Sequence, residues 1–178
     1  MKIVIVSGGF DPLHSGHINH FEAARGLGDK LIIALNSDDW LARKKGQPFM
    51  PFHERAAIIS KLQVVDDVWQ FNDDDESASA ALVRAKTAFP DATIIFGNGG
   101  DRQKDNIPEM DVEGVEFVFG VGGNNKANSS SWILKEWQQP TKSRLWGKYS
   151  DLFRDSAVKV KELIILSLIH ISEPTRRR

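Results

Sequence analysis

The chain of 178 residues contains no cysteine. Disulfide frameworks and thiolate metal sites are therefore excluded, and a reducing cytoplasm is the expected location. No apolar run is long enough to span a bilayer, and the opening run Lys2 to Val6 is too short for a signal peptide. The net charge is only −1, from 23 Lys and Arg against 24 Asp and Glu. This balance argues against a general binder of nucleic acid or of membrane surfaces.

Hydrophobic residues make up 41% of the chain, enough for a substantial single core. Short β-branched or aromatic runs bounded by Gly, Asp or Asn predict buried parallel strands at 3–6, 31–35, 64–69, 93–96 and 115–119. Helical patterns lie between them, at 17–27, 51–62 and 77–89. This alternation predicts a right-handed, doubly wound α/β sheet, whose ligands bind at the carboxyl ends of the strands. The loops 7–17, 97–102 and 120–131 follow predicted strands and are expected to share one crevice.

A glycine-rich segment with two histidines follows the first predicted strand. It runs from Gly8 to His17 and places two imidazoles and several backbone amides at a strand-to-helix junction. Glycine lets the backbone approach a ligand closely, and the N-terminus of the following helix directs N–H groups and a positive dipole end toward it. We therefore expect the ligand to be an anion such as a triphosphate.

The same segment resembles the signature of the cytidylyltransferase-like nucleotidyltransferases, in the form Gly8-x-Phe10-Asp11-x-x-His14-x-Gly16-His17. Members of this family join an NTP to a phosphorylated small molecule and release pyrophosphate. The resemblance continues in the family's order over residues 1–138, through Leu27-Gly28-Asp29, Asn36-Ser37-Asp38, Arg43-Lys44-Lys45-Gly46, His53-Glu54-Arg55, Val65-Asp66, Gly97-x-Gly99-Gly100-Asp101 and Ser129-Ser130-Ser131. It implies a Rossmann-like, doubly wound parallel five-stranded sheet with helices on both faces.

The reaction of this family implies an electrostatic role for the two histidines. The acceptor phosphate attacks the α-phosphorus while pyrophosphate departs, so catalysis needs positioning and neutralisation of negative charge. His14 and His17 can donate imidazole N–H groups to the triphosphate, whereas the alternative makes them core or surface histidines. His20 lies one turn after His17, but the signature does not include it, and we interpret it as structural.

Basic residues before the helix at Pro51 complete the expected anion site. The resemblance implies that Lys44 and Lys45, in a loop expected to be mobile, act in catalysis by engaging the phosphates of nucleotide and acceptor; the alternative is a solvated charged surface. Arg55 resembles the acceptor-phosphate arginine of the family, and the alternative is a surface salt bridge with Glu54 or Asp39. The expected acceptor-binding residues are Asp38, Arg43 and Arg55.

Nucleotide-binding residues are expected from the glycine-rich segment and from two later loops. Residues 97–102 resemble a base-recognition loop, with a plain glycine turn as the alternative. Residues 120–131 end in serines that predict the N-cap of a helix over 131–137, suited to hold the β- and γ-phosphates. Many relatives carry an arginine where this chain has Lys126, which lacks the planar guanidinium fork. The expected nucleotide-binding residues are Gly8, Gly9, Phe10, Asp11, Gly16, Gly97, Gly99, Gly100, Asp101, Lys126, Ser129 and Ser130.

We expect Mg²⁺ to arrive with the NTP. No tight carboxylate constellation for a protein-only metal site is visible in the sequence, although Asp11 or Asp38 could hold the ion directly or through water. The acidic run from Asp73 to Glu76 is interpreted as structural, because the start of a helix favours acidic residues through its dipole.

The composition changes after Trp137. Residues 139–143 form a polar, Pro-containing segment, which predicts a linker after a nucleotidyltransferase domain at 1–138. Residues 144–165 resemble the opening strands of a mannose-6-phosphate-isomerase-like cupin domain, and the alternative is an ordinary C-terminal helix. Residues 166–178 resemble one reading frame of a transposase-based sequencing-library adapter, and the alternative is a genuine amphipathic or strand-like tail. We therefore assign no function to His170 or to the terminal arginines.

The resemblance implies an enzyme that transfers NMP from CTP or ATP to a small phosphomonoester such as a sugar or polyol phosphate. The nearest resemblance is to the heptose-1-phosphate adenylyltransferase and glycerol-3-phosphate cytidylyltransferase branch. A homodimer is expected, with neither nucleic acid nor membrane as a partner. The alternatives are an FMN adenylyltransferase-like enzyme and a nucleotide-sensing module without turnover. The two histidines and the basic segment disfavour the sensor, because such a module needs no donors aimed at a transition state.

Overall fold

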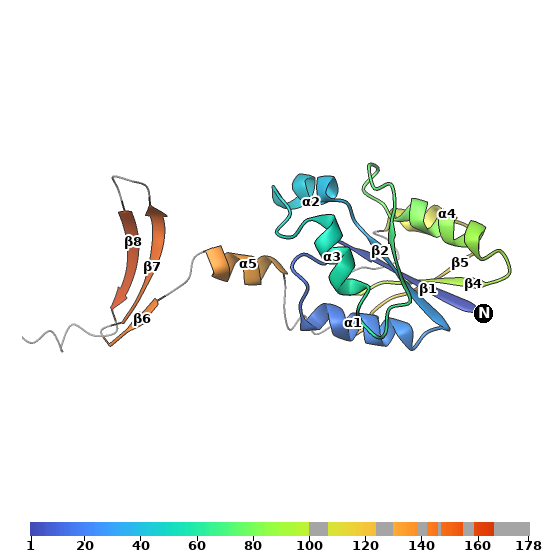
Figure 1. Ribbon diagram of the computed structural model, residues 1–178, viewed down its shortest axis with the longest axis horizontal. Helices are drawn as coiled ribbons and strands as arrows, with labels where there is room; N and C mark the ends of the chain where they lie inside the picture. Colours follow the sequence, from blue (N-terminus) through green and yellow to red (C-terminus); the bar gives the residue numbers. More distant parts are fainter. Residues whose placement is uncertain (100–106, 124–129, 139–141, 146, 155–158, 166–178) are drawn as a thin grey trace, which may run out of the picture. The chain divides into compact units, whose positions relative to one another are not determined.

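The computed structural model describes residues 1–99, 107–123, 130–138, 142–145, 147–154 and 159–165. The chain divides into two compact units, Met1–Ser130 and Ser131–Arg178. The first unit contains β1 (Lys2–Gly8), α1 (Ser15–Arg25), β2 (Lys30–Leu35), α2 (Asp38–Lys45), α3 (Phe52–Ile59), β3 (Asp67–Gln70), α4 (Ser79–Ala88), β4 (Thr93–Gly97), the 3₁₀ helix η2 (Pro108–Asp111) and β5 (Val115–Val118) (Figure 1).

The strands of the first unit form one parallel sheet in the order β3-β2-β1-β4-β5. The chain builds outward from β1 to β3 and then returns to the other side of β1 with β4. The order therefore reverses between β1 and β4, and the carboxyl ends of these two strands flank the crevice where α/β sheets bind ligands. The predicted doubly wound, Rossmann-like α/β fold is confirmed, and all five strands lie where their β-branched runs place them.

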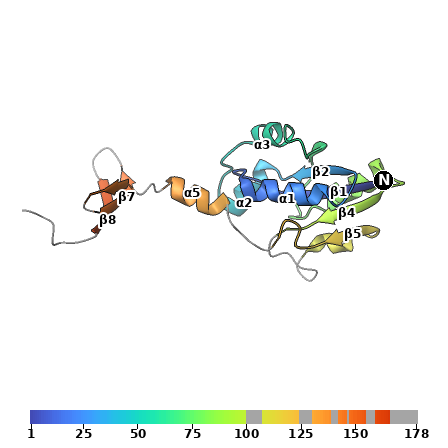
Figure 2. The same cartoon turned by 90° about the horizontal axis from the view of Figure 1, so that it is seen from below.

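Helices cover both faces of this sheet. Side chains alternate along a strand, so neighbouring residues of β1 enter different cores. Ile5 packs in a buried cluster with Leu82 of α4, whereas Val6 packs in a second cluster with Phe21 of α1 and Ile59 of α3. Figure 1 shows α1 and α4 on opposite sides of the strands, and Figure 2 shows α1 lying across the sheet when it is seen from below. The two cores hold β1 rigidly, and with it the loop that follows.

Helix α2 corrects the expectation of a mobile loop at the basic run. Arg43 to Lys45 form the last turn of this helix. Ser37 begins it with an extended backbone, and the Oγ of Ser37 accepts a hydrogen bond from Trp40 N at 3.0 Å. Gly46 ends it with a φ of 90°, a conformation that favours glycine. The three cations lie at the negative end of the helix dipole, which stabilises them there. The basic run is therefore held by the backbone hydrogen bonds of α2.

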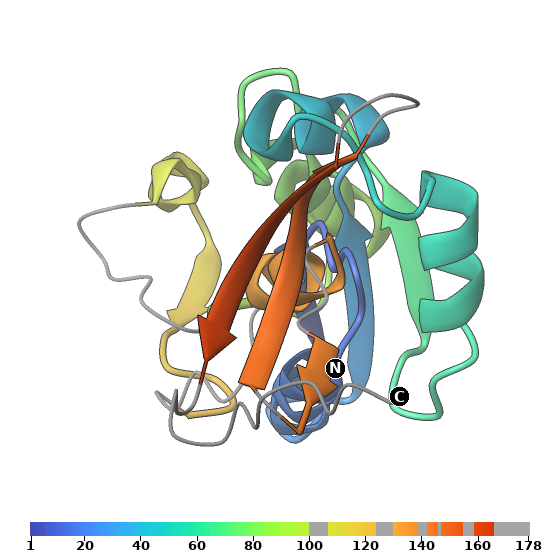
Figure 3. The same ribbon diagram turned by 90° about the vertical axis from the view of Figure 1, so that its left-hand side faces the viewer.

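The second unit contains α5 (Ser130–Gln138), whose first residue still belongs to the first unit, β6 (Lys142–Arg144), β7 (Gly147–Arg154) and β8 (Lys159–Ile165). The strands form an antiparallel sheet in the order β6-β7-β8. Figure 3 shows β7 and β8 side by side in orange and red. The alternative of a helix over 144–165 is wrong, because these described residues pair as strands.

The cupin resemblance and the predicted domain boundaries stay predictions. Strand β6 begins within the segment expected to be a linker, and residues 166–178 lie outside the described residues. Among the residues that the structure describes, no helix is both long and apolar enough to cross a bilayer.

Candidate active site

The loop after β1 brings His14 and His17 into contact. His14 is the N-cap residue of α1 and His17 lies in its first turn, so a spacing of three residues puts both on one face. Their imidazole rings stack with centroids 3.7 Å apart and planes 23° apart. The ring of Phe10 packs edge-on against His17, with centroids 5.0 Å apart. A Cβ at Gly8 would lie 2.8 Å from the ring of Phe10, so a larger residue there would displace that ring.

Burial keeps this histidine pair neutral. It lowers the pKa of His17 to about 3, aided by the nearby charges of His14, His20 and Lys45. Burial and then Lys45 also lower the pKa of His14. Among the described residues, neither Nδ1 atom of the pair has a hydrogen-bond partner, although both atoms are buried. An unsatisfied buried polar atom costs free energy, so a ligand that bonds to these nitrogens would remove that cost.

The N-terminus of α1 suits an anion. The side chain of His14 makes no capping hydrogen bond, and the first turn of the helix carries no acidic residue. Backbone N–H groups and the positive dipole end therefore face the glycine-rich loop without a competing carboxylate from this turn. Of the predicted nucleotide-binding residues, Gly8, Gly9, Phe10, Asp11 and Gly16 all belong to this loop or to the first turn.

Lys45 reaches the glycine-rich loop, whereas Lys44 lies elsewhere. Lys45 Nζ donates to the carbonyl oxygen of Asp11 at 2.9 Å, and its charge lowers the pKa of both His14 and His17. Lys44 Nζ lies over the ring of Trp40, 4.7 Å from its centroid. The sequence predicts the same role for both lysines. In the structure only Lys45 of the two lies beside the histidine pair.

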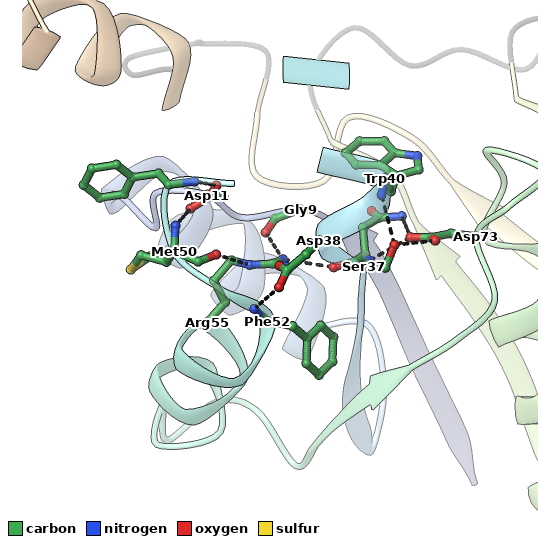
Figure 4. Close-up of polar contacts among 11 residues, drawn as sticks. Gly9, Asp11, Ser37, Asp38, Trp40, Met50, Phe52, Arg55 and Asp73 are labelled. Atoms are coloured by element: carbon green, nitrogen blue, oxygen red, sulfur yellow. Dashed lines mark hydrogen bonds and ion pairs between the residues drawn. The ribbon is translucent and has the colours of Figure 1, made fainter. Parts of the chain in front are cut away.

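Asp11 holds the α2–α3 connection against the glycine-rich loop. Its carboxylate is fully buried and accepts hydrogen bonds from Phe49 N at 2.6 Å and from Met50 N at 2.9 Å (Figure 4). Both oxygens are therefore engaged by the backbone, and the predicted role of Asp11 at a metal ion, directly or through water, stays a prediction. No group of three or more acidic or histidine side chains within the described ranges could hold a metal ion. Mg²⁺ stays a prediction attached to the NTP.

Arg55 is a buried bridge between three segments. Its guanidinium donates to Gly9 O at 2.8 Å, to Asn36 O at 3.0 Å and to Asp38 Oδ1 at 2.6 Å, while Nε donates to Met50 O at 3.0 Å. Figure 4 shows the guanidinium lying between these groups. The side chain is 0% exposed, so its charge needs this shell of acceptors.

The expected alternative for Arg55, a surface salt bridge with Glu54 or Asp39, is wrong. The partner is Asp38, which follows β2 and also accepts from Phe52 N at 2.9 Å. Burial alone would raise the pKa of Asp38, but the hydrogen bonds from Phe52 and Arg55 outweigh it and lower that pKa. Arg55 and Asp38 hold the segments after β1 and β2 against the α2–α3 connection. Their predicted contact with an acceptor stays a prediction.

The acidic run contributes one buried anchor. The carboxylate of Asp73 accepts from Ser37 N at 2.8 Å, Ser37 Oγ at 2.7 Å and Asn36 Nδ2 at 3.0 Å. Arg43 Nη2 donates to the carbonyl oxygen of Asp73 at 2.8 Å. Asp73 is therefore structural, as predicted. It does not cap the helix that follows it: its carboxylate holds the start of α2 and its carbonyl oxygen holds Arg43 near the end. An open depression of about 490 Å³ lies beside this anchor, lined by Ser37, Asp39, Gln70, Phe71, Asn72, Asp73 and Asp74.

The loops after β4 and β5 are bonded to each other. Asn98 N donates to Val118 O at 2.8 Å, and Val121 N donates to Asn98 O at 3.0 Å. Gly97, the last residue of β4, and Gly99, in the loop after it, therefore lie beside the carboxyl end of β1. Ser130 Oγ donates to Pro12 O at 3.0 Å, which brings the start of α5 to the glycine-rich loop. The predicted residues Gly100, Asp101, Lys126 and Ser129 lie outside the described residues.

The sequence interpretation treats His20 as structural and does not predict its contact with the loop after β5. Its Nδ1 lies 2.8 Å from the carbonyl oxygen of Val121, across 101 positions of the chain. The signal available in the sequence is its spacing of three residues from His17, which places both on one face of α1.

Comparison with known proteins finds a family model that matches this chain. The family model described as cytidylyltransferase-like matches residues 5–117, which span the strand, the glycine-rich loop and both histidines. The chain belongs to the cytidylyltransferase-like family.

Two relatives of this cytidylyltransferase-like chain each match about seven tenths of its length. It is 36% identical over 128 residues to the bifunctional protein HldE of Hahella chejuensis, covering 71% of this chain and 24% of the relative. It is 39% identical over 127 residues to the bifunctional protein HldE of Pasteurella multocida, covering 70% of this chain and 24% of the relative. The chain thus spans about a quarter of the length of these curated relatives. A crystal structure of the lipopolysaccharide core biosynthesis protein from Thermoplasma volcanium matches with a TM-score of 0.49 and 29% identity, covering 67% of this chain and 95% of that chain.

Proposed function

We propose that the first unit transfers NMP from CTP or ATP to a small phosphomonoester and releases pyrophosphate. The observation that carries this proposal is the stacked, neutral pair of His14 and His17, whose buried Nδ1 atoms lack partners within the described residues, at the N-terminus of α1. Membership of the cytidylyltransferase-like family supports the same reaction class.

The proposed chemistry is a direct displacement. An oxygen of the acceptor phosphate forms a bond to the α-phosphorus of the NTP, and the bond from that phosphorus to the bridging oxygen breaks. Pyrophosphate leaves with the electron pair, and no covalent enzyme intermediate forms. The protein contributes alignment of the two anions and donors for the negative charge that develops.

His14, His17 and Lys45 supply those donors. Burial lowers the pKa of both histidines, whereas the negative charge of a triphosphate would raise it. Nucleotide binding therefore favours the protonated form of each ring, in which both nitrogens carry an N–H. Lys45 lies next to the pair and adds a point charge, which reduces the repulsion between the attacking phosphate and the triphosphate. Mg²⁺ bound to the NTP would neutralise further charge on the phosphates.

A sugar or polyol phosphate is the acceptor that we propose. The sequence resemblance to the heptose-1-phosphate adenylyltransferase and glycerol-3-phosphate cytidylyltransferase branch supports it. The absence of cysteine and the net charge of −1 support a cytoplasmic enzyme that binds neither nucleic acid nor membrane. We further propose a homodimer, which light scattering on the purified chain tests directly.

Pyrophosphate release tests the function. The purified chain is incubated with each of the four NTPs against glycerol-3-phosphate, phosphocholine, hexose-1-phosphates, heptose-1-phosphate and FMN. We expect turnover with CTP or ATP and a sugar or polyol phosphate. Turnover with FMN alone would identify the FMN adenylyltransferase-like alternative. Tight NTP binding without turnover on any acceptor would identify a nucleotide sensor and overturn the proposal.

A further inference from the structure

His20 joins helix α1 to the loop after β5. The helix places it one turn beyond His17, and its Nδ1 lies 2.8 Å from the carbonyl oxygen of Val121. A carbonyl oxygen only accepts, so Nδ1 carries the proton and donates. The hydrogen bond links parts of the chain 101 positions apart. It therefore fixes tertiary arrangement rather than local helix structure.

Two glycines make room for this imidazole. A Cβ at Gly99 would lie 2.9 Å from His20 Nδ1 and 3.1 Å from Val121 O. A Cβ at Gly122 would lie 3.0 Å from His20 Cα, and Gly122 also has a φ of 88°, which favours glycine. His20 is thus enclosed by the loop after β4 and the loop after β5, and larger residues at either glycine would displace it.

Hydrogen bonds join the two loops to each other, and His20 joins them to α1. Val121 N donates to Asn98 O at 3.0 Å, so the carbonyl that His20 holds belongs to a residue bonded to the β4 loop. The loop after β4 lies beside the carboxyl end of β1, where the strand order reverses. Ligands of open α/β sheets bind in that crevice. A ligand whose phosphates lie at the N-terminus of α1 therefore has these loops as one wall of its site.

We propose that His20 is a positioning residue for the nucleotide: it sets the distance between the phosphate-binding turn of α1 and the described parts of the two loops, residues 98–99 and 119–122. The inference rests on the proposed function, because it takes the ligand of the crevice to be an NTP. His20 touches neither reacting phosphate, so it acts through the backbone of Val121 and Gly99. Removing it shifts these loops relative to α1 and leaves the hydrogen bonds of Arg55 and Asp38, which fix other loops, in place.

Substitution of His20 separates this role from general stability. His20→Leu removes the donor, whereas His20→Asn supplies an amide N–H near the position of Nδ1. We expect His20→Leu to raise the KM for the NTP by about three- to tenfold, as loss of one neutral hydrogen bond does. The KM for the acceptor stays within about twofold, and His20→Asn restores most of the NTP affinity. Glu22→Leu, an exposed position on the same helix, is the matched control and leaves both KM values unchanged.

A double-mutant cycle with Gly99 tests the contact itself. Gly99→Ala in the wild-type background drives a Cβ into the imidazole and raises the KM for the NTP. In the His20→Ala background the imidazole is gone, so Gly99→Ala adds a clearly smaller increase. Equal effects in both backgrounds would show that the two residues act independently, which overturns the proposal. These variants also serve if His20→Leu does not fold.

The proposal and the proposed function fail differently. Direct NTP binding is measured by titration calorimetry on the same variants, without any acceptor. Absence of pyrophosphate release from the wild type, together with weaker NTP binding by His20→Leu, overturns the enzyme but supports the role of His20. Normal NTP binding by His20→Leu, or equal increases in both KM values with no rescue by asparagine, overturns the role of His20.

Discussion

The rings of His14 and His17 stack 3.7 Å apart, and burial lowers the pKa of both. Two imidazolium ions at that separation repel each other, so the pair is neutral until an anion arrives. Each neutral ring has a single N–H donor. The site is therefore prepared for a triphosphate without holding positive charges against each other in its absence.

Replacing either histidine by alanine should lower kcat far more than NTP affinity. A donor aimed at charge that develops in the transition state contributes about 10²- to 10³-fold to kcat. The measurement is steady-state pyrophosphate release beside NTP titration calorimetry. Glu22→Ala, on the same helix, is the control. Near-normal turnover in either histidine variant would contradict the electrostatic role.

Stability should fall as the pH drops below 6.5. The pKa of His17 is about 3 in the folded chain and 6.5 when the chain unfolds, so the unfolded state binds more protons between these values. The free energy of unfolding therefore rises with pH across that window, by about 1.4 kcal/mol per pH unit for one such histidine, and levels off above it. The pKa of Asp38 is also lowered, from an ordinary value of 3.8. Asp38 therefore affects the free energy of unfolding only near and below pH 3.8.

Urea denaturation between pH 5 and pH 7.5 measures this dependence. For His17→Asn, the free energy of unfolding should rise less steeply with pH than for the wild type, by about the equivalent of one proton. The folded wild type should also take up protons when it binds NTP at pH 6, because the triphosphate favours the charged imidazoles. Greater stability at pH 5 than at pH 7 would contradict the assignment.

The two lysines should differ in effect. Lys45→Met removes the charge beside the histidine pair and should lower kcat and raise the KM for the acceptor. Lys44→Met removes an ammonium that lies on Trp40 and should change both constants by less than about threefold. Steady-state kinetics with the acceptor varied compares them. The opposite order would show that Lys44 turns into the site when substrate binds.

Arg55→Met should destabilise the fold. It leaves Asp38 without its ion-pair partner and several carbonyl oxygens without a donor, at a cost of about 3–5 kcal/mol. Arg84→Met is the matched control, because Arg84 lies on the face of Trp69 and donates to Gln70 O at an exposed position. Urea denaturation of both variants gives the comparison. Unchanged stability in Arg55→Met, with only a raised KM for the acceptor, would assign Arg55 to substrate binding alone.

Removal of residues 166–178 should leave nucleotidyl transfer unchanged. The segment resembles a sequencing-library adapter frame, and none of the predicted site residues lies in it. The truncated and full chains are compared by pyrophosphate release at equal concentration. A strong loss of activity in the truncated chain would contradict the adapter interpretation.

Local patterns were sufficient to predict the sheet and the histidine pair. The runs at β1, β2 and β4 are apolar on both sides, as strands covered by helices on both faces must be. Such patterning is visible in a single stretch of chain. The same holds for His14 and His17, whose spacing of three residues puts them on one helix face.

Partners far apart in the sequence were not predictable in this way. Arg55 could be assigned to a surface or to a ligand from its neighbours, yet its acceptors come from residues 9, 36, 38 and 50. Helix α2 has only eight residues, so its apolar pattern is too short to separate it from a loop. His20 depends on Val121, and no local signal indicates that pair.

The outermost strands of the sheet are short and bear charge. β3 and β5 have four residues each, against seven in the central β1. At the start of β3 the Asp67 carboxylate accepts from Val68 N at 2.8 Å and from Trp69 Nε1 at 2.7 Å, so a side chain occupies a backbone donor that a passing strand would need. Glu116 adds a charge in β5. Short, charged edge strands offer a poor template for strand addition by a second copy of the chain, so we expect the first unit to resist edge-to-edge aggregation.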